Sequence, residues 1–194
     1  MPKLIIINGA SGAGKTYLLE TISHKDSSMS PIKKLTTRKP RSYESIGSSP
    51  DLYFASVESD IKALEYSYEF NGEWYGISKT HIDDALIAGK YPLVIVRDYP
   101  TITKLISDYP KQSLAFYIQG IYSDSKLKIK LLDQGRDSTD VEENIRRNKT
   151  NFDLYIEYLQ KDLFDRCIFN YYDDTFLKQM EYFVEKDRKS ESRR

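Results

Sequence analysis

Eight residues near the N-terminus have the types and spacing of a phosphate-binding loop. They read Gly9-Ala10-Ser11-Gly12-Ala13-Gly14-Lys15-Thr16 and fit the pattern G-x-x-x-x-G-K-[ST] in full. Glycines at these positions let the backbone approach phosphate oxygens without Cβ clashes. The Lys15 ammonium would reach the β- and γ-phosphates of ATP, and the Thr16 hydroxyl would bind Mg²⁺. The sequence therefore predicts a site for ATP and Mg²⁺, with all eight residues as nucleotide ligands.

The loop lies where a strand must turn into a helix. Residues 4–7 form an unbroken apolar run, typical of a parallel strand that is covered on both faces. Leu18, Leu19 and Ile22 follow at helical spacing. The alternative, a merely glycine-rich turn, is disfavoured because the phosphate-binding mechanism requires a strand before the loop and a helix after it.

The rest of the chain repeats the alternation of strands and helices. Apolar runs at 93–96 and 114–118 have the buried-strand pattern, and 101–107 between them is helical in pattern. This alternation predicts an α/β fold, a P-loop three-layer sandwich around a parallel sheet. A chain of 194 residues suits one domain, which we expect over 1–185, before a charged, frayed tail at 186–194.

A second set of residues could bind a second phosphate. Arg38 and Arg41 lie three apart around the rigid Pro40, so their guanidiniums can clamp one phosphate by forked hydrogen bonds. The Tyr75 phenol could add a neutral donor. Proline, serine and aromatic residues are frequent around them, and we expect a small acceptor-binding lobe over 34–78. A solvated basic turn with a packed tyrosine is the alternative interpretation.

Residues 123–135 and 139–163 have a helical pattern, with a polar segment, 133–138, between them, and we expect a lid region over 123–150. A joint of this kind can act as a mobile lid. Transfer of a phosphoryl group accumulates negative charge, so the lid should supply cations when it closes. Arg136, Arg146 and Arg147 are the candidates for this catalytic role, although each could equally be a surface residue.

Three segments together resemble the guanylate kinase family. They are Lys34-Leu35-Thr36-Thr37-Arg38-Lys39-Pro40-Arg41, Tyr75-Gly76-Ile77-Ser78-Lys79 and Gln134-Gly135-Arg136-Asp137-Ser138. The resemblance covers roughly residues 4–172. It implies transfer of the ATP γ-phosphoryl group to an acceptor monophosphate, with GMP or dGMP as the leading acceptor. It also implies that Arg38, Arg41 and Tyr75 bind the acceptor phosphate, and we add Tyr53 and Ser78 as acceptor-side candidates.

The chain departs from this family where guanine is read. The family uses a small hydroxyl residue where this chain has Lys34 or Leu35, and a glutamate where an ungapped count places Tyr66. Glu65 and Glu69 are close to that position but in other registers. A site that lacks these groups should discriminate less between bases. A phosphorylated sugar such as ribose 1,5-bisphosphate therefore remains an alternative acceptor, and a non-catalytic phosphate-binding module an alternative function.

Two more positions differ from the family. Its acceptor-contacting strand tyrosine aligns with Leu52, although Tyr53 is adjacent. Its Asp-x-Asp pair at a strand end is reduced to Asp98, with Arg97 one residue before it. A carboxylate at the end of a sheet strand faces the P-loop crevice, so Asp98 is our candidate for holding Mg²⁺. Capping of the following helix is the alternative role for Asp98.

Composition argues against several other classes of protein. Lysine plus arginine and aspartate plus glutamate number 29 each, so no net positive field predicts nucleic acid or a membrane surface as a partner. A single cysteine excludes an internal disulfide, and the apolar run before Gly9 is too short for a signal peptide or a membrane span. We expect a cytoplasmic monomer or homodimer acting on a small phosphorylated acceptor.

Overall fold

The computed structural model describes residues 1–40, 44, 49–55, 57–150, 152, 156–157, 160–173 and 175–191. Its central sheet has the strand order β2-β7-β1-β8-β9, and every neighbouring pair is parallel. The strands are β1 (Leu4–Gly9), β2 (Met29–Pro31), β7 (Tyr91–Ile95), β8 (Ser113–Gly120) and β9 (Arg166–Asn170). The predicted parallel α/β sheet is therefore confirmed.

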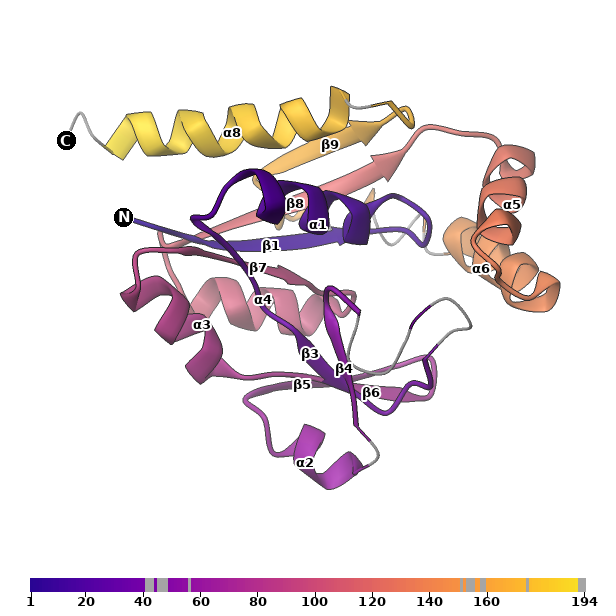
Figure 1. The fold of residues 1–194 in the computed structure, drawn as a ribbon, viewed down its shortest axis with the longest axis horizontal. Helices are drawn as coiled ribbons and strands as arrows, with labels where there is room; N and C mark the ends of the chain where they lie inside the picture. The colour runs from indigo at the N-terminus through magenta and orange to yellow at the C-terminus, as the bar shows by residue number, and fades with distance from the viewer. Residues whose placement is uncertain are drawn as a thin grey trace.

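Helices cover both faces of this sheet (Figure 1). Helices α1 (Lys15–Lys25) and α8 (Thr175–Glu191) lie on one face, and α3 (Lys79–Ile87) and α4 (Tyr99–Asp108) on the other. Strand β1 explains the layering, because its alternate side chains enter different cores. Ile5 packs with Leu18 of α1, whereas Leu4 packs with Ile102 of α4. The three-layer sandwich is thus built by a strand that is apolar on both sides.

The segment expected to form an acceptor lobe folds into a second, four-stranded sheet of order β4-β3-β6-β5. Its elements are β3 (Lys34–Thr36), β4 (Leu52–Phe54), α2 (Glu58–Lys62), β5 (Tyr66–Phe70) and β6 (Glu73–Ile77). Strands β5 and β6 form a hairpin whose turn residues, Asn71 and Gly72, both have positive φ, as a two-residue hairpin turn requires. Tyr66 and Ile77 pack in the same apolar cluster as Leu4, so the lobe shares the main core.

The segment expected to act as a lid contains α5 (Asp124–Asp133) and α6 (Ser138–Thr150), which lie at the carboxyl end of the central sheet (Figure 1). Leu127, Leu131 and Val141 form a small apolar cluster between the two helices. The lid therefore has a core of its own, separate from the two main clusters.

The C-terminal segment differs from the frayed tail expected over 186–194. Helix α8 continues to Glu191, while 192–194 lie outside the described residues. Ion pairs with distant residues hold its last turns: Lys3 Nζ lies 2.6 Å from Asp187, and Arg188 Nη2 lies 2.9 Å from Asp26. These partners are more than 160 residues away in the chain, so a local pattern of charges could not predict them. Within the described residues, no helix is long and apolar enough to cross a membrane.

Candidate nucleotide-binding site

The P-loop takes a shape that depends on glycine. Gly9 has a φ of 143° and Gly12 a φ of 79°, both in the region that other residues rarely adopt. A Cβ on Gly9 would lie 2.4 Å from the Ile118 carbonyl oxygen of β8, and one on Gly12 would lie 2.5 Å from Leu127 of the lid. The loop is therefore packed tightly against the sheet on one side and the lid on the other.

Lys15 lies at the mouth of this loop and is only 5% exposed. Its ammonium donates to the carbonyl oxygens of Gly9 at 2.7 Å and Ala10 at 2.6 Å. Burial lowers the pKa of Lys15 well below its usual value, and the positive charges of Arg97 and Lys34 lower it further. An anionic phosphate bound at this point would relieve that repulsion.

Side chains from the end of the sheet hold the loop from outside. Asn170 Nδ2 donates to the Ala13 carbonyl oxygen at 3.0 Å, and the Tyr172 hydroxyl donates to that of Gly12 at 2.7 Å. Sequence reasoning missed both residues, because an asparagine and a tyrosine after an apolar run carry no distinctive motif.

The lid contacts the P-loop through Ser11. Asn148 makes two hydrogen bonds to its backbone: Asn148 Oδ1 accepts from the Ser11 N–H at 3.2 Å, and Nδ2 donates to the Ser11 carbonyl at 3.1 Å. Arg136 Nη1 lies 3.4 Å from the Ser11 hydroxyl. The structure thus brings one of the three predicted lid arginines to the loop, together with an asparagine that the sequence did not single out.

The other two predicted lid arginines, Arg146 and Arg147, both form ion pairs with Glu143 of α6. Arg146 forms a forked pair with Glu143, both contacts at 2.7 Å, and Arg147 Nε donates to the same carboxylate at 2.7 Å. Hydrogen bonds from Arg146 and then Arg147 lower the pKa of Glu143 to about 2. Both guanidiniums contact Glu143 in this arrangement, and their catalytic role stays a prediction.

A pocket joins the P-loop to the acceptor lobe; we call it the crevice pocket. It is lined by Lys15, Thr16, Lys34, Arg38, Glu44, Asp51, Leu52, Tyr68, Tyr75, Ile95 and Arg97. Four of the predicted site residues, Lys15, Thr16, Arg38 and Tyr75, therefore share one cavity. The pocket also contains charged groups that motif reasoning did not assign, above all Asp51 and Arg97.

Arg38 and Tyr75 lie in the crevice pocket with partners of their own. Arg38 Nη2 is 2.9 Å from Glu44, and its guanidinium lies over the Phe54 ring at 5.3 Å. The Tyr75 ring stacks on Tyr68, with ring centres 5.4 Å apart and 16° between the planes. The third member of the predicted clamp, Arg41, lies outside the described residues.

A buried ion pair lies within the acceptor lobe, and its lysine also bonds to the central sheet. Lys34 is 3% exposed, and its ammonium lies 3.2 Å from Asp51 and donates to the Ile95 carbonyl oxygen at 2.6 Å. Burial alone would raise the pKa of Asp51, but the Lys34 charge and hydrogen bond lower it below its usual value. The Asp51 carboxylate is thus ionised at neutral pH.

Two predicted acceptor-side residues lie away from the crevice pocket. Tyr53 is 47% exposed and stacks under the Lys33 ammonium, 4.9 Å from its ring centre, because β4 points Leu52 into the pocket and its neighbour outward. Ser78 is the N-cap of α3, where its hydroxyl accepts from the His81 N–H at 3.4 Å. The structure therefore does not place Tyr53 or Ser78 with the other site residues.

The positions that an ungapped count assigned to guanine reading do not all lie in the crevice pocket. Lys34, rather than Leu35, faces the crevice pocket. The Tyr66 hydroxyl donates to Asp108 at 2.9 Å, and Glu65 accepts from the Lys79 N–H at 3.1 Å in an exposed turn. Glu69 occupies the exposed side of β5. Tyr68 is therefore the residue of this strand that lines the pocket.

Asp98 has the capping role considered as its alternative. Its Oδ2 accepts from the Thr101 N–H at 2.8 Å and from the Thr101 hydroxyl at 2.6 Å, which caps α4. Among the described residues, none of the His, Cys, Asp and Glu side chains cluster in threes to form a metal site. The crevice pocket offers a hydroxyl from Thr16 and carboxylates from Glu44 and the ionised Asp51, which are oxygen donors of the kind that Mg²⁺ requires.

This fold and this pocket define a P-loop protein with a second, smaller sheet beside the loop and a pair of helices against it. Residues 1–187 match the guanylate kinase family. The chain is 34% identical over 123 residues to the guanylate kinase of Chlamydia felis, covering 55% of this chain and 59% of that protein. It is 27% identical over 179 residues to that of a Polaromonas species (86% and 83%), and 31% identical over 148 residues to that of Bacillus cereus (73% and 69%).

A solved structure supports the same conclusion for the fold. Guanylate kinase from Anaplasma phagocytophilum superimposes with a TM-score of 0.65 over 96% of this chain and 86% of that one, at 14% identity. The chain therefore belongs to the guanylate kinase family, a family of phosphotransferases.

Proposed function

We propose that this chain transfers the γ-phosphoryl group of ATP to a nucleoside monophosphate, with GMP or dGMP as the acceptor. The observation that carries the proposal is the crevice pocket, in which Lys15 and Thr16 of the P-loop share one cavity with Arg38 and Tyr75 of the acceptor lobe. The names of its relatives, which are guanylate kinases, support the same acceptor.

The chemistry needs positioning and charge more than covalent catalysis. An oxygen of the acceptor phosphate attacks the γ-phosphorus of ATP in line, the bond from that phosphorus to the β–γ bridging oxygen breaks, and ADP leaves. Lys15 holds phosphate oxygens on the ATP side, while Arg38 and Tyr75, with Arg41, hold the acceptor phosphate. Arg136, already at Ser11, would add positive charge when the lid closes.

Few protein atoms of this site would contact a bound Mg²⁺ ion. When bound, the ion would offset the negative charge of the phosphates. Thr16 would supply a hydroxyl ligand, and Asp51 an ionised carboxylate toward its water shell. Asp98, our first candidate, already uses an oxygen in capping α4 and does not line the crevice pocket.

The base preference is expected to be weak. Lys34 stands where the family has a small hydroxyl, and Glu65, Tyr66 and Glu69 lie away from the crevice pocket. A missing hydrogen-bonding group removes much of the discrimination between substrates. We therefore expect GMP to be preferred over AMP by less than about a hundredfold in kcat/KM.

An ADP-release assay with GMP, dGMP, AMP and ribose 1,5-bisphosphate tests these statements. Turnover with GMP or dGMP is the expected result. Turnover with ribose 1,5-bisphosphate alone would identify a phosphorylated sugar as the acceptor. Turnover with none of the four would reject phosphoryl transfer and favour a non-catalytic phosphate-binding module. The cytoplasmic location and the monomeric or dimeric state expected from the sequence remain predictions.

A further inference from the structure

Arg97 follows strand β7 and lines the crevice pocket, where its charge acts on Lys15. The guanidinium carbon lies 5.4 Å from the centre of the Phe70 ring, which gives it an apolar support on the acceptor lobe. Its neighbour Asp98 points elsewhere, to cap α4. Arg97 thus stands between the central sheet and the lobe, at the end of the sheet where the P-loop lies.

The charged side chains that line the crevice pocket carry an excess of positive charge. Arg38 is paired with Glu44 at 2.9 Å, and Lys34 with Asp51 at 3.2 Å. Within the described part of the chain, no hydrogen bond or ion pair engages the Arg97 guanidinium, so its five donors are available to a ligand. Apart from these two ion pairs, the charged side chains that line the pocket are Lys15 and Arg97, and both are positive.

These two cations act on each other. After burial, Arg97 is the largest of the influences that lower the pKa of the Lys15 ammonium. Two like charges near each other in a partly desolvated pocket are unfavourable, and an anion that contacts both removes the cost. Lys15 is the group that meets the ATP phosphates in a loop of this kind, so the anion that satisfies Arg97 lies next to them.

We propose that Arg97 binds phosphate oxygens at the junction where the γ-phosphoryl group of ATP meets the acceptor phosphate. This inference rests on the proposed function and assigns it a further catalytic residue. Arginine suits this position because its planar fork donates two parallel hydrogen bonds to one phosphate, and because it keeps its charge in a desolvated site. Arg38, by contrast, must share its guanidinium with Glu44.

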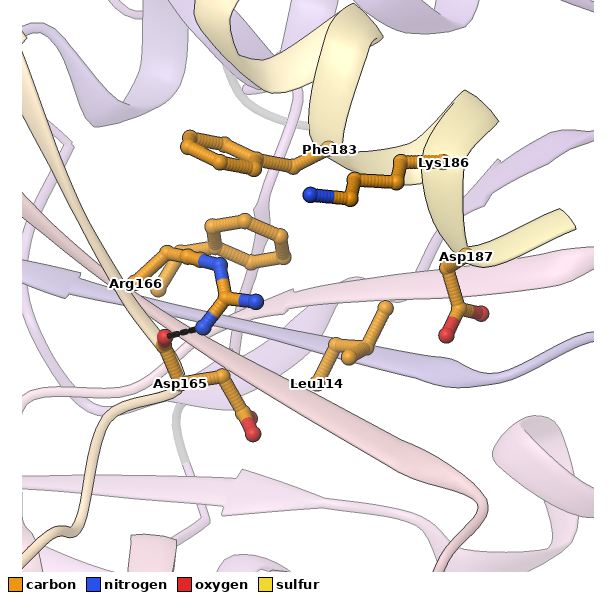
Figure 2. Close-up of a pocket in the computed structure, with 7 residues that line it drawn as sticks. Leu114, Asp165, Arg166, Phe183, Lys186 and Asp187 are labelled. Atoms are coloured by element: carbon orange, nitrogen blue, oxygen red, sulfur yellow. Dashed lines mark hydrogen bonds between the residues drawn. The ribbon is translucent and has the colours of Figure 1, made fainter. Parts of the chain in front are cut away.

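The test compares Arg97→Met, Arg97→Lys and a matched control, Arg166→Met. Arg166 also lies over a phenylalanine, 5.5 Å from the centre of the Phe183 ring, but at a separate pocket between β9 and α8 (Figure 2). The control therefore removes the same kind of arginine–ring contact at a position outside the crevice pocket.

With GMP and ATP as substrates, Arg97→Met should lower kcat/KM for the acceptor by about 10- to 100-fold, as expected for a lost charge-assisted contact. Arg97→Lys should recover part of the loss, because it keeps the charge without the fork. Arg166→Met should retain wild-type kinetics. Wild-type turnover in both Arg97 variants would overturn the inference while leaving the proposed function intact.

A binding measurement separates this inference from the proposed function. Titration of the nucleotide-free full-length proteins with inorganic phosphate and with pyrophosphate should show weaker binding by Arg97→Met than by the wild type or Arg166→Met, at unchanged melting temperature. If the wild type transfers phosphate to no acceptor, the proposed function fails, yet this difference in binding would still support Arg97 as an anion ligand. Equal binding by all three proteins would overturn it. If Arg97→Met does not fold, Arg97→Lys replaces it in the same comparison, because the fork is then the only feature lost.

Discussion

The two sides of the crevice pocket are built in different ways. The P-loop side comes from one contiguous segment, residues 9–16, whose backbone is shaped by its own glycines. The acceptor side is assembled from the separate strands β3, β4, β5, β6 and β7, and it contains two ion pairs. A site of the first kind can be recognised from a motif. A site of the second kind depends on which charges the fold brings together, so substitutions should affect the two sides differently.

The largest effect is expected on the acceptor side, at the Lys34–Asp51 pair. Asp51→Asn or Lys34→Met alone leaves a buried charge without its partner, which should lower the free energy of unfolding by about 3–5 kcal/mol. The double variant should lose much less, since both charges are gone. Urea unfolding of the four proteins measures this coupling. Losses that simply add in the double variant would show that the two residues do not act as a pair.

The next largest effect is expected on the P-loop side, in catalysis rather than in stability. Lys15→Ala should lower kcat by about 10²–10³, the usual cost of removing one donor to a transition-state oxyanion. Its melting temperature should stay close to the wild-type value, because the ammonium contacts loop carbonyls rather than the apolar core. Lys25→Ala, at the other end of the same helix, is the control. Near-wild-type turnover in Lys15→Ala would reject the P-loop assignment.

A smaller effect, on the acceptor side alone, is expected at Arg38. Arg38→Ala should raise KM for GMP more than KM for ATP, with a loss of about 1.5–3 kcal/mol of acceptor binding. Glu44→Gln should have the opposite sign, because Glu44 competes with the acceptor phosphate for the Arg38 guanidinium. Arg41→Ala should resemble Arg38→Ala. Equal changes in both KM values would place these arginines outside the acceptor site.

The smallest effect concerns the end of α8, remote from both sides. Burial by itself raises the pKa of Asp26, but hydrogen bonds from Ser28 and Arg188 together lower it below its usual value. A lowered folded-state pKa contributes stability above the unfolded pKa of about 3.9, and this stability is lost as the pH falls through the folded value. Because both side chains are about one-third exposed, the contribution should be less than about 1 kcal/mol.

Melting temperatures of the wild type and Asp26→Asn between pH 7 and pH 2 check this sign. The wild type should be the more stable protein at pH 5–7, and the difference should disappear toward pH 2. A difference that grows on acidification would mean that another group controls the end of α8.

Much of the architecture followed from local patterns. Buried strands at 4–7, 93–96 and 114–118 are recognisable because a strand covered on both faces must be apolar throughout. The P-loop is recognisable because its conformation needs glycine at fixed spacing. Arg38 and Tyr75 came from a family resemblance, and the structure places both in the crevice pocket.

Side-chain direction and ion pairing, by contrast, depend on the tertiary fold and could not be predicted from local patterns. Tyr53 and Leu52 are neighbours in sequence, yet the pleat of β4 sends them to opposite sides. Asp98 and Arg97 are likewise adjacent, yet the Asp98 carboxylate caps the start of α4 whereas Arg97 lines the crevice pocket. Lys34 meets Asp51 because two short strands pair in parallel, which no local pattern encodes. The P-loop could be predicted from the sequence, because contiguous residues form it. The set of charges that lines the crevice pocket could not be predicted in this way, because those charges come from strands that are brought together only by folding.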